Sequence, residues 1–189
     1  RAQYPGKKII FSMGRLVSYK GYEYLISAMT HLPEEYVLLI GSDGPLKEQL
    51  QQRIEELGLK DRVTLLGGLK EEKKQAYFGA CDVFCLSSVM KTEAYAIVLV
   101  EAMSLGRPVI ATKIPESGVS WVNAHEVSGL NVPVRDPEAL AEAIHKICGD
   151  PELWKRYSQG ARQRYDDIFT KDEMINNLIE TYTQLLNNN

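Results

Sequence analysis

Short, continuous apolar runs alternate with longer amphipathic segments along residues 8–132. The apolar runs predict buried β-strands, at residues 8–14, 36–41, 62–67, 82–86, 108–111 and 129–132. The intervening segments repeat apolar residues at helical spacing and predict helices, at residues 21–32, 46–57, 71–80 and 94–105. Strands without polar alternation, separated by helices, indicate a parallel sheet covered on both faces. The pattern therefore predicts a doubly wound, Rossmann-like α/β domain whose ligands bind at the carboxyl ends of the strands.

Helices are also predicted to close the chain, between about residues 137 and 186. Asp136 and Asp150 each precede a proline, which places a capping side chain directly before the first helical position. Thr170 and Glu173 have the spacing of a capping box. The last of these helices carries apolar residues on one side, at Ile175, Leu178, Ile179, Tyr182 and Leu185.

The composition fits one large domain, residues 1–189, because 44% of the residues are hydrophobic and 25% are charged. A net charge of −3 argues against nucleic acid or an anionic membrane as the main partner. No apolar run is long enough to predict a transmembrane helix. Three cysteines without a CxxC pair predict buried free thiols in a reducing compartment rather than disulfides or a zinc site. The chain begins with Arg1 rather than Met, which suggests a fragment of a longer protein.

The predicted helix at residues 94–105 is apolar or small on every face except at Glu101 and Ser104, which is typical of a buried helix. A buried carboxylate is costly unless it is hydrogen-bonded, so Glu101 needs a partner. Vicinal hydroxyls of a ligand would serve as well as an arginine, and a structural ion pair is the alternative. Glu93 is expected at or just before the helix N-terminus, where free amides suit a phosphate, and a plain acid at the start of the helix is the alternative.

The loops after the first two strands carry the features that a diphosphate site requires. Gly14 permits close backbone approach, and Arg15 and Lys20 place two cations on one loop. Gly44 belongs to a second tight loop at the same edge, with a simple turn as the alternative. Alternatively, Arg15 and Lys20 are ordinary solvated charges. The sequence contains no GxGxxG, no GxxxxGK[ST] and no Asp-x-Asp, which argues against a nicotinamide dehydrogenase, a P-loop NTPase and the simplest acidic metal site.

Taken in order, the motifs resemble the C-terminal, donor-binding half of a GT-B glycosyltransferase of the large retaining family four (glycosyl transferases group 1). They are Gly14-Arg15-Leu16 with Lys20-Gly21, Gly41-x-x-Gly44-Pro45, Glu93-x7-Glu101-Ala102-Met103 and Gly106-x-Pro108-Val109-Ile110-Ala111. Each motif alone is weak, but the ordered set is specific. The similarity extends from about residue 8 to the C-terminal helix.

The resemblance implies a site for a nucleoside-diphosphate sugar, such as a UDP- or GDP-hexose, between this domain and an N-terminal acceptor-binding domain that the chain lacks. It assigns Arg15 and Lys20 to the diphosphate, Glu93 to hydroxyls of the transferred sugar and Glu101 to the ribose. The implied catalytic residues are Arg15, Lys20 and Glu93. The full set of implied donor-binding residues is Gly14, Arg15, Lys20, Gly44, Leu69, Glu93, Tyr95, Ala96, Ile97 and Glu101, with the backbone near Leu69 meeting the base.

The implied reaction is hexosyl transfer with retention, without a cofactor or an essential metal. The resemblance also implies polysaccharide synthesis in the cytoplasm, at the inner face of the membrane if the missing half binds there. The fragment alone should transfer little, and its last helix is expected to pack across to the missing half. The alternatives are a nucleotide-binding or structural module without transferase activity and a GT-B sugar-nucleotide epimerase.

One position departs from the family pattern, because a glycine usually stands where this chain has Ala96. A methyl group there would crowd the donor or require a different backbone path. Two further residues have simpler structural interpretations. Glu116 is expected to be a surface acid, and Trp121 is expected to lie in the core.

Overall fold

The computed structural model describes residues 1–187, which contain a six-stranded parallel sheet with the strand order β3-β2-β1-β4-β5-β6. The strands are β1 (Lys8–Met13), β2 (Tyr36–Gly41), β3 (Val63–Gly67), β4 (Val83–Leu86), β5 (Val109–Thr112) and β6 (Gly129–Val132). All neighbouring pairs are parallel. The prediction of a doubly wound, Rossmann-like α/β sheet is therefore confirmed.

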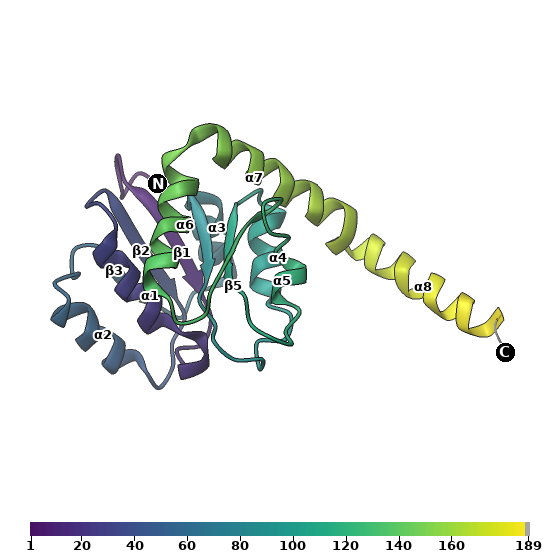
Figure 1. The fold of residues 1–189 in the computed structure, drawn as a ribbon, viewed down its shortest axis with the longest axis horizontal. Coiled ribbons are helices and arrows are strands. Elements are labelled where there is room, and N and C mark those ends of the chain that lie inside the picture. Colours follow the sequence, from purple (N-terminus) through teal and green to yellow (C-terminus); the bar gives the residue numbers. More distant parts are fainter. Residues whose placement is uncertain (188–189) are drawn as a thin grey trace.

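Helices cover both faces of the sheet, and Figure 1 shows α1 and α6 in front of it and α3 behind it. The α-helices are α1 (Tyr22–Ala28), α2 (Lys47–Glu56), α3 (Glu71–Ala80), α4 (Ile97–Ser104), α5 (Val119–Val122), α6 (Pro137–Gly149), α7 (Pro151–Arg164) and α8 (Lys171–Asn187). Successive residues of β1 point to opposite faces. Ile10 packs in a core with α1, α2 and α6, whereas Ile9 and Phe11 pack in a second core with α3, α4 and α5. The strands read as unbroken apolar runs because both faces are buried.

The strand order creates a topological switch point between β1 and β4. From β1 the chain goes first to β2 and β3 on one side, and then returns to β4, β5 and β6 on the other. The loops that follow β1 and β4 therefore leave neighbouring strands at the same edge and run toward opposite sides of the sheet. Ligands of open α/β sheets bind at such a point, outside the carboxyl ends of the strands.

Two predictions of burial are wrong. The helix α4 buries Leu99, Ala102 and Met103, but Ile97 is 68% exposed, so the helix is not buried on every face. The helix packs against β4, β5, α3 and α7, but these elements leave Ile97 at its N-terminus uncovered. Trp121 is 55% exposed rather than in the core. The short helix α5 turns its other apolar residues, including Val119, inward and leaves Trp121 on the surface.

The closing helices are capped as predicted. Asp136 accepts a hydrogen bond from the amide of Ala139, and Asp150 accepts from two amides at the start of α7. A π-helical turn, Tyr165–Phe169, links α7 to α8. Figure 1 shows α8 extending away from the rest of the molecule. Its apolar residues lie in the open, since Leu178 is 56% and Tyr182 60% exposed.

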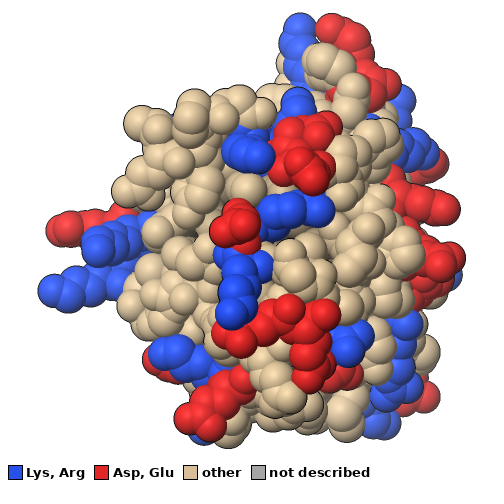
Figure 2. Space-filling model, turned by 90° about the vertical axis from the view of Figure 1, so that its left-hand side faces the viewer, with Lys and Arg blue, Asp and Glu red and all other residues tan. Residues whose placement is uncertain are grey.

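The surface carries charges of both signs close together. Figure 2 shows Lys and Arg interspersed with Asp and Glu on the side of the molecule that is at the left in Figure 1. On and near α2, Lys47 pairs with Asp43 and Lys60 pairs with Glu55, each at 3.3 Å. None of the helices within residues 1–187 is both long and apolar enough to cross a membrane.

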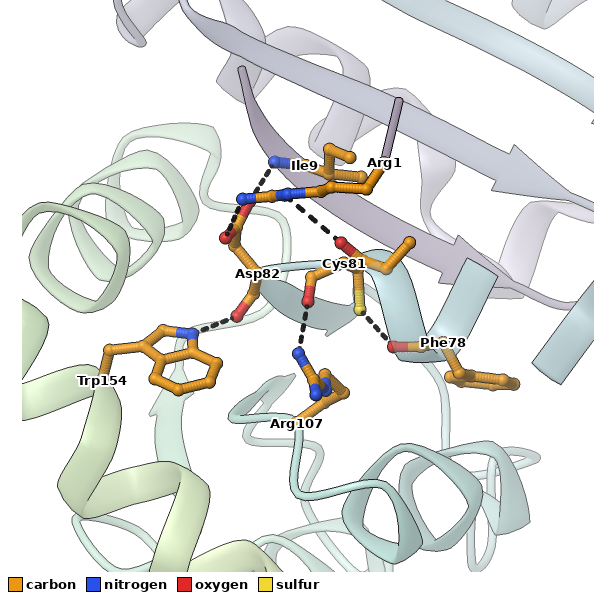
Figure 3. Close-up of polar contacts among 8 residues, drawn as sticks. Arg1, Ile9, Phe78, Cys81, Asp82, Arg107 and Trp154 are labelled. Carbon is orange, nitrogen blue, oxygen red and sulfur yellow. Dashed lines mark hydrogen bonds and ion pairs between the residues drawn. The ribbon is translucent and has the colours of Figure 1, made fainter. Parts of the chain in front are cut away.

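Asp82 links several elements at the amino ends of β1 and β4, as Figure 3 shows. Its Oδ2 accepts hydrogen bonds from the Ile9 amide and from Arg1 Nη1, both at 2.6 Å. The Trp154 indole donates to the Asp82 carbonyl at 2.6 Å. The Asp82 side chain is only 18% exposed, so these bonds are largely shielded from water.

Replacing Asp82 with alanine should lower the free energy of unfolding by about 1–3 kcal/mol, because the Ile9 amide loses its acceptor. Urea denaturation of the two proteins measures this difference. The control is Asp166→Ala, which removes an exposed carboxylate that pairs with Arg162 at 2.7 Å. That variant should keep the parent's midpoint. Equal losses in both variants would show that Asp82 contributes only as a surface charge.

Candidate functional site

Backbone contacts hold together the loops that follow β1 and β4. The Val89 amide donates to the Tyr19 carbonyl at 2.7 Å, and the Ser87 hydroxyl donates to the Lys20 carbonyl at 2.9 Å. Gly21 has φ +64°, and a Cβ there would lie 2.2 Å from the Ser87 carbonyl oxygen. Only glycine fits this approach, so Gly21 is required for the two loops to meet.

Lys20 and Glu93 meet at this junction. Lys20 Nζ lies 2.5 Å from Glu93 Oε2, and the two side chains are only 11% and 10% exposed. The Ser88 hydroxyl donates to the same oxygen at 2.7 Å. The structure thus brings together two of the three residues that the sequence analysis names as catalytic. Glu93 lies four residues before the first residue of α4, in the loop rather than on the helix.

Arg15, the third of these residues, is exposed, and its guanidinium has no partner within residues 1–187. It follows Gly14, which has φ +152°. A Cβ at Gly14 would lie 3.1 Å from Lys20 Cε, so the lysine side chain runs across this glycine. The Tyr22 hydroxyl donates to the Gly14 carbonyl at 2.7 Å. Arg15 is therefore free to contact a ligand, while Lys20 is paired with Glu93.

The loops after β2 and β3 lie at the same edge. The amide of Leu46 donates to the carbonyl of Leu16 at 3.1 Å, and a Cβ at Gly44 would lie 2.6 Å from Leu16 backbone atoms. Leu69 is half-buried, and its Cδ1 would lie 2.7 Å from a Cβ at Gly41. Gly44 thus serves the packing of two loops, and Leu69 sits beside the end of β2.

The segment before α4 presents unpaired backbone amides. Ala96 is the N-cap of α4 with φ +56° and ψ +63°, and the amides of Tyr95, Ala96 and Ile97 donate to no acceptor in the described part of the chain. Tyr95 and Ile97 are 41% and 68% exposed. The positive end of the helix dipole therefore faces outward, where an anion would be stabilised.

Ala96 has a left-handed backbone conformation, which glycine adopts without strain. Its methyl group is nevertheless buried, because the residue is 6% exposed and belongs to the core that includes Leu99. The methyl group thus packs inward rather than over the unpaired amides.

Replacing Ala96 with glycine should change the free energy of unfolding by less than about 1 kcal/mol. Relief of the left-handed strain, about 1 kcal/mol, offsets the loss of one buried methyl group. Urea denaturation tests this, with Ala102→Gly as the control. Ala102 is fully buried inside α4, so its replacement removes a methyl group without relieving strain and should cost more than about 1 kcal/mol. A loss at Ala96 as large as that at Ala102 would contradict the strain at Ala96.

Glu101 finds its partner on the neighbouring helix. Lys74 Nζ in α3 lies 2.8 Å from Glu101 Oε1 and 2.8 Å from Glu71. Burial acts to lower the pKa of Lys74, but the hydrogen bonds to both carboxylates raise it above the ordinary value. The Glu101 side chain is 31% exposed, so a ligand can still reach it. The ion pair that the sequence analysis gives as the alternative is present, and the ribose contact stays a prediction.

The loop after β5 contributes contacts that the sequence analysis does not anticipate. The Ser117 hydroxyl donates to the Glu93 carbonyl at 2.5 Å, and the Gly118 amide donates to the Ala94 carbonyl at 2.9 Å. The position of this loop in the sheet could have indicated these contacts, because the loop that follows β5 lies beside the loop that follows β4. Glu116, in contrast, is an exposed acid, as predicted.

Two features define the class of the domain. One is the strand order, and the other is that charged side chains and free amides converge at the switch point. The chain forms a Rossmann-like α/β domain of the kind that forms one half of GT-B glycosyltransferases. Residues 1–164 match the family model described as glycosyl transferases group 1, and the chain belongs to this family.

Relatives and solved structures agree with this family. O-antigen chain mannosyltransferase C of Escherichia coli is 32% identical over 183 residues, which cover 96% of this chain and 48% of that protein. The glycosyltransferase LpsD of lipopolysaccharide core biosynthesis in Rhizobium meliloti is 33% identical, and the match covers 92% of this chain and 49% of that protein. The structure of Anabaena Alr3699/HepE in complex with UDP has a TM-score of 0.87 and 26% identity, with 97% and 50% covered. The chain thus spans about half the length of these proteins.

Proposed function

We propose that this chain is the C-terminal, donor-binding half of a retaining hexosyltransferase that needs no metal. It binds a nucleoside-diphosphate sugar and, joined to an N-terminal acceptor-binding half, transfers the hexosyl group to an acceptor. The observation that carries the proposal is the nearly buried pair of Lys20 and Glu93 at the switch point. It is supported by the similarity to Alr3699/HepE, whose structures contain UDP and UDP-glucose.

The cations act on the diphosphate. Lys20 is within reach of the loop before α4, because it already contacts Glu93 there. Arg15 lies on the same loop as Lys20, and its guanidinium has five N–H donors suited to phosphate oxygens. Together with the free amides near Ala96, these groups stabilise the charge that develops on the leaving diphosphate.

The carboxylates recognise hydroxyl groups. Glu93 accepts hydrogen bonds from hydroxyls of the transferred sugar, and Glu101 accepts from the ribose. The structure supports a ligand role for Glu101 in one respect, since its side chain is 31% exposed and is not confined to the ion pair with Lys74. The backbone near Leu69 receives the base at the neighbouring loop.

The second half of the enzyme completes the site and covers α8. The chain spans about half the length of its relatives, and α8 exposes Met174, Leu178 and Tyr182 at 60%, 56% and 60%. We place the apolar side of α8 against the N-terminal half. The isolated chain, residues 1–189, then folds as one domain and binds the donor but transfers little sugar.

The relatives suggest the biological context. Two of them are named for O-antigen chain and lipopolysaccharide core synthesis, so we assign the reaction to cell-surface polysaccharide synthesis. The free, buried cysteines at 81, 85 and 148 suit the reducing cytoplasm. Contact with the inner face of the membrane would come through the N-terminal half.

Calorimetric titration of the chain with UDP, GDP and ADP tests the proposal, with and without EDTA. We expect one of the three nucleotides to bind, with an affinity that EDTA does not change. Binding that EDTA abolishes would overturn the metal-independent mechanism. A folded chain that binds none of the three would favour the structural module instead.

A further inference from the structure

The two oxygens of the Glu93 carboxylate have different surroundings. Oε2 accepts hydrogen bonds from Lys20 Nζ at 2.5 Å and from the Ser88 hydroxyl at 2.7 Å. Oε1 accepts none from the residues that the structure describes. The residue as a whole is only 8% exposed, so the few contacts it makes determine where the free oxygen points.

Ser88 is itself fixed by the sheet. It directly follows Ser87 at the carboxyl end of β4 and is 0% exposed. The hydroxyl of Thr112, at the end of the neighbouring strand β5, donates to the Ser88 carbonyl. The backbone of Ser88 is therefore held at the ends of two strands, and its hydroxyl lies one rotatable bond from that backbone, whereas Lys20 reaches Glu93 from a separate loop with a long, rotatable side chain.

Glu93 and a bound diphosphate compete for the ammonium group of Lys20. An anionic diphosphate attracts the ammonium group and weakens its pairing with the carboxylate. The hydroxyl of Ser88 is neutral, so the phosphates do not draw it away. Once Lys20 turns toward the diphosphate, Ser88 is the remaining side chain that holds Oε2.

We propose that Ser88 is a positioning residue for recognition of the donor sugar. By holding Glu93 Oε2, it presents Oε1 to a hydroxyl of the sugar while Lys20 contacts the diphosphate. This inference rests on the proposed function. It adds a residue that no motif in the sequence analysis includes.

The test separates binding of the sugar from binding of the nucleotide. Calorimetry gives the dissociation constants of UDP, GDP and ADP and of UDP-glucose, GDP-mannose and ADP-glucose. For the nucleotide that binds, the ratio of the two constants measures the contribution of the sugar. We expect Ser88→Ala to reduce this contribution about three- to tenfold, the value of one hydrogen bond, and to change the affinity for the nucleotide less than about twofold.

Two further variants give the result its meaning. In a Glu93→Ala background, Ser88→Ala should leave the ratio unchanged, because the serine acts through the carboxylate. Ser128→Ala is the matched control, since it removes another fully buried hydroxyl, which donates to Asn123 at 2.8 Å away from the site. This control should leave the ratio as in the parent protein. If Ser88→Ala does not fold, Ser88→Cys replaces it, because a thiol is a weaker donor of similar size and should give an intermediate ratio.

An unchanged ratio in the folded Ser88 variant would overturn the inference. An equal drop in the parent and Glu93→Ala backgrounds would also overturn it, because the serine would then act on the sugar by another route. Failure of the proposed function is a separate result, in which the parent chain itself binds none of the nucleotides.

Discussion

Turnover of the intact enzyme should fall at least about 100-fold when Lys20 is replaced with alanine, because one donor to the leaving diphosphate is lost. The side chain is 11% exposed and its ammonium group lies at the switch point, so water replaces it poorly. The measurement is the initial rate of sugar transfer by the intact enzyme, with saturating donor. Near-normal turnover would contradict the assignment of Lys20 to the diphosphate.

The control for this experiment is Lys91→Ala. Lys91 lies on the loop between β4 and α4, but its side chain is 71% exposed and pairs with Glu116 at 3.1 Å. This variant should keep the parent's rate. Thermal unfolding of the Lys20 variant, followed by circular dichroism, checks that the loss is not one of folding, since among the described residues the Glu93 carboxylate then keeps only Ser88 as a partner.

The second large effect is expected in nucleotide binding, where Glu101→Ala should weaken the affinity of the chain tenfold or more. A hydrogen bond to a charged group is typically worth about 1.5–3 kcal/mol, and Glu101 is assigned to the ribose hydroxyls. Calorimetric titration with the nucleotide that binds measures the change. An affinity equal to that of the parent would leave Glu101 with only its structural ion pair.

Glu71→Ala separates these two roles of Glu101. Both carboxylates lie 2.8 Å from Lys74 Nζ, so each variant removes one partner of the lysine. Glu71 is 68% exposed and is assigned no contact with the nucleotide. If the effect of Glu101→Ala arose only from the freed Lys74, the two variants would weaken binding equally. We expect Glu71→Ala to bind as tightly as the parent.

The elements of the fold could be predicted because they depend on local patterns. An apolar run such as residues 36–41 forms a strand that is buried on both faces, as the structure shows for β2. Asp136 and Asp150 cap helices through bonds to amides two or three residues away. Burial on every face of a helix is not local, because it depends on how many neighbours surround the helix. This is why the predictions for α4 and Trp121 are wrong.

The sequence by itself determined the strands, the helix caps, the class of sheet and the family, because each follows from periodicity or from motifs in order. It also named Lys20 and Glu93, but as separate residues with separate tasks. Only the tertiary structure decided that they form one nearly buried pair, 73 positions apart in the chain. The tertiary structure alone showed that Ser88 contacts Glu93 and that Lys74 pairs with Glu101. The physical reason is that such contacts depend on which strand ends become neighbours and on the paths of the loops between them, which no local pattern encodes.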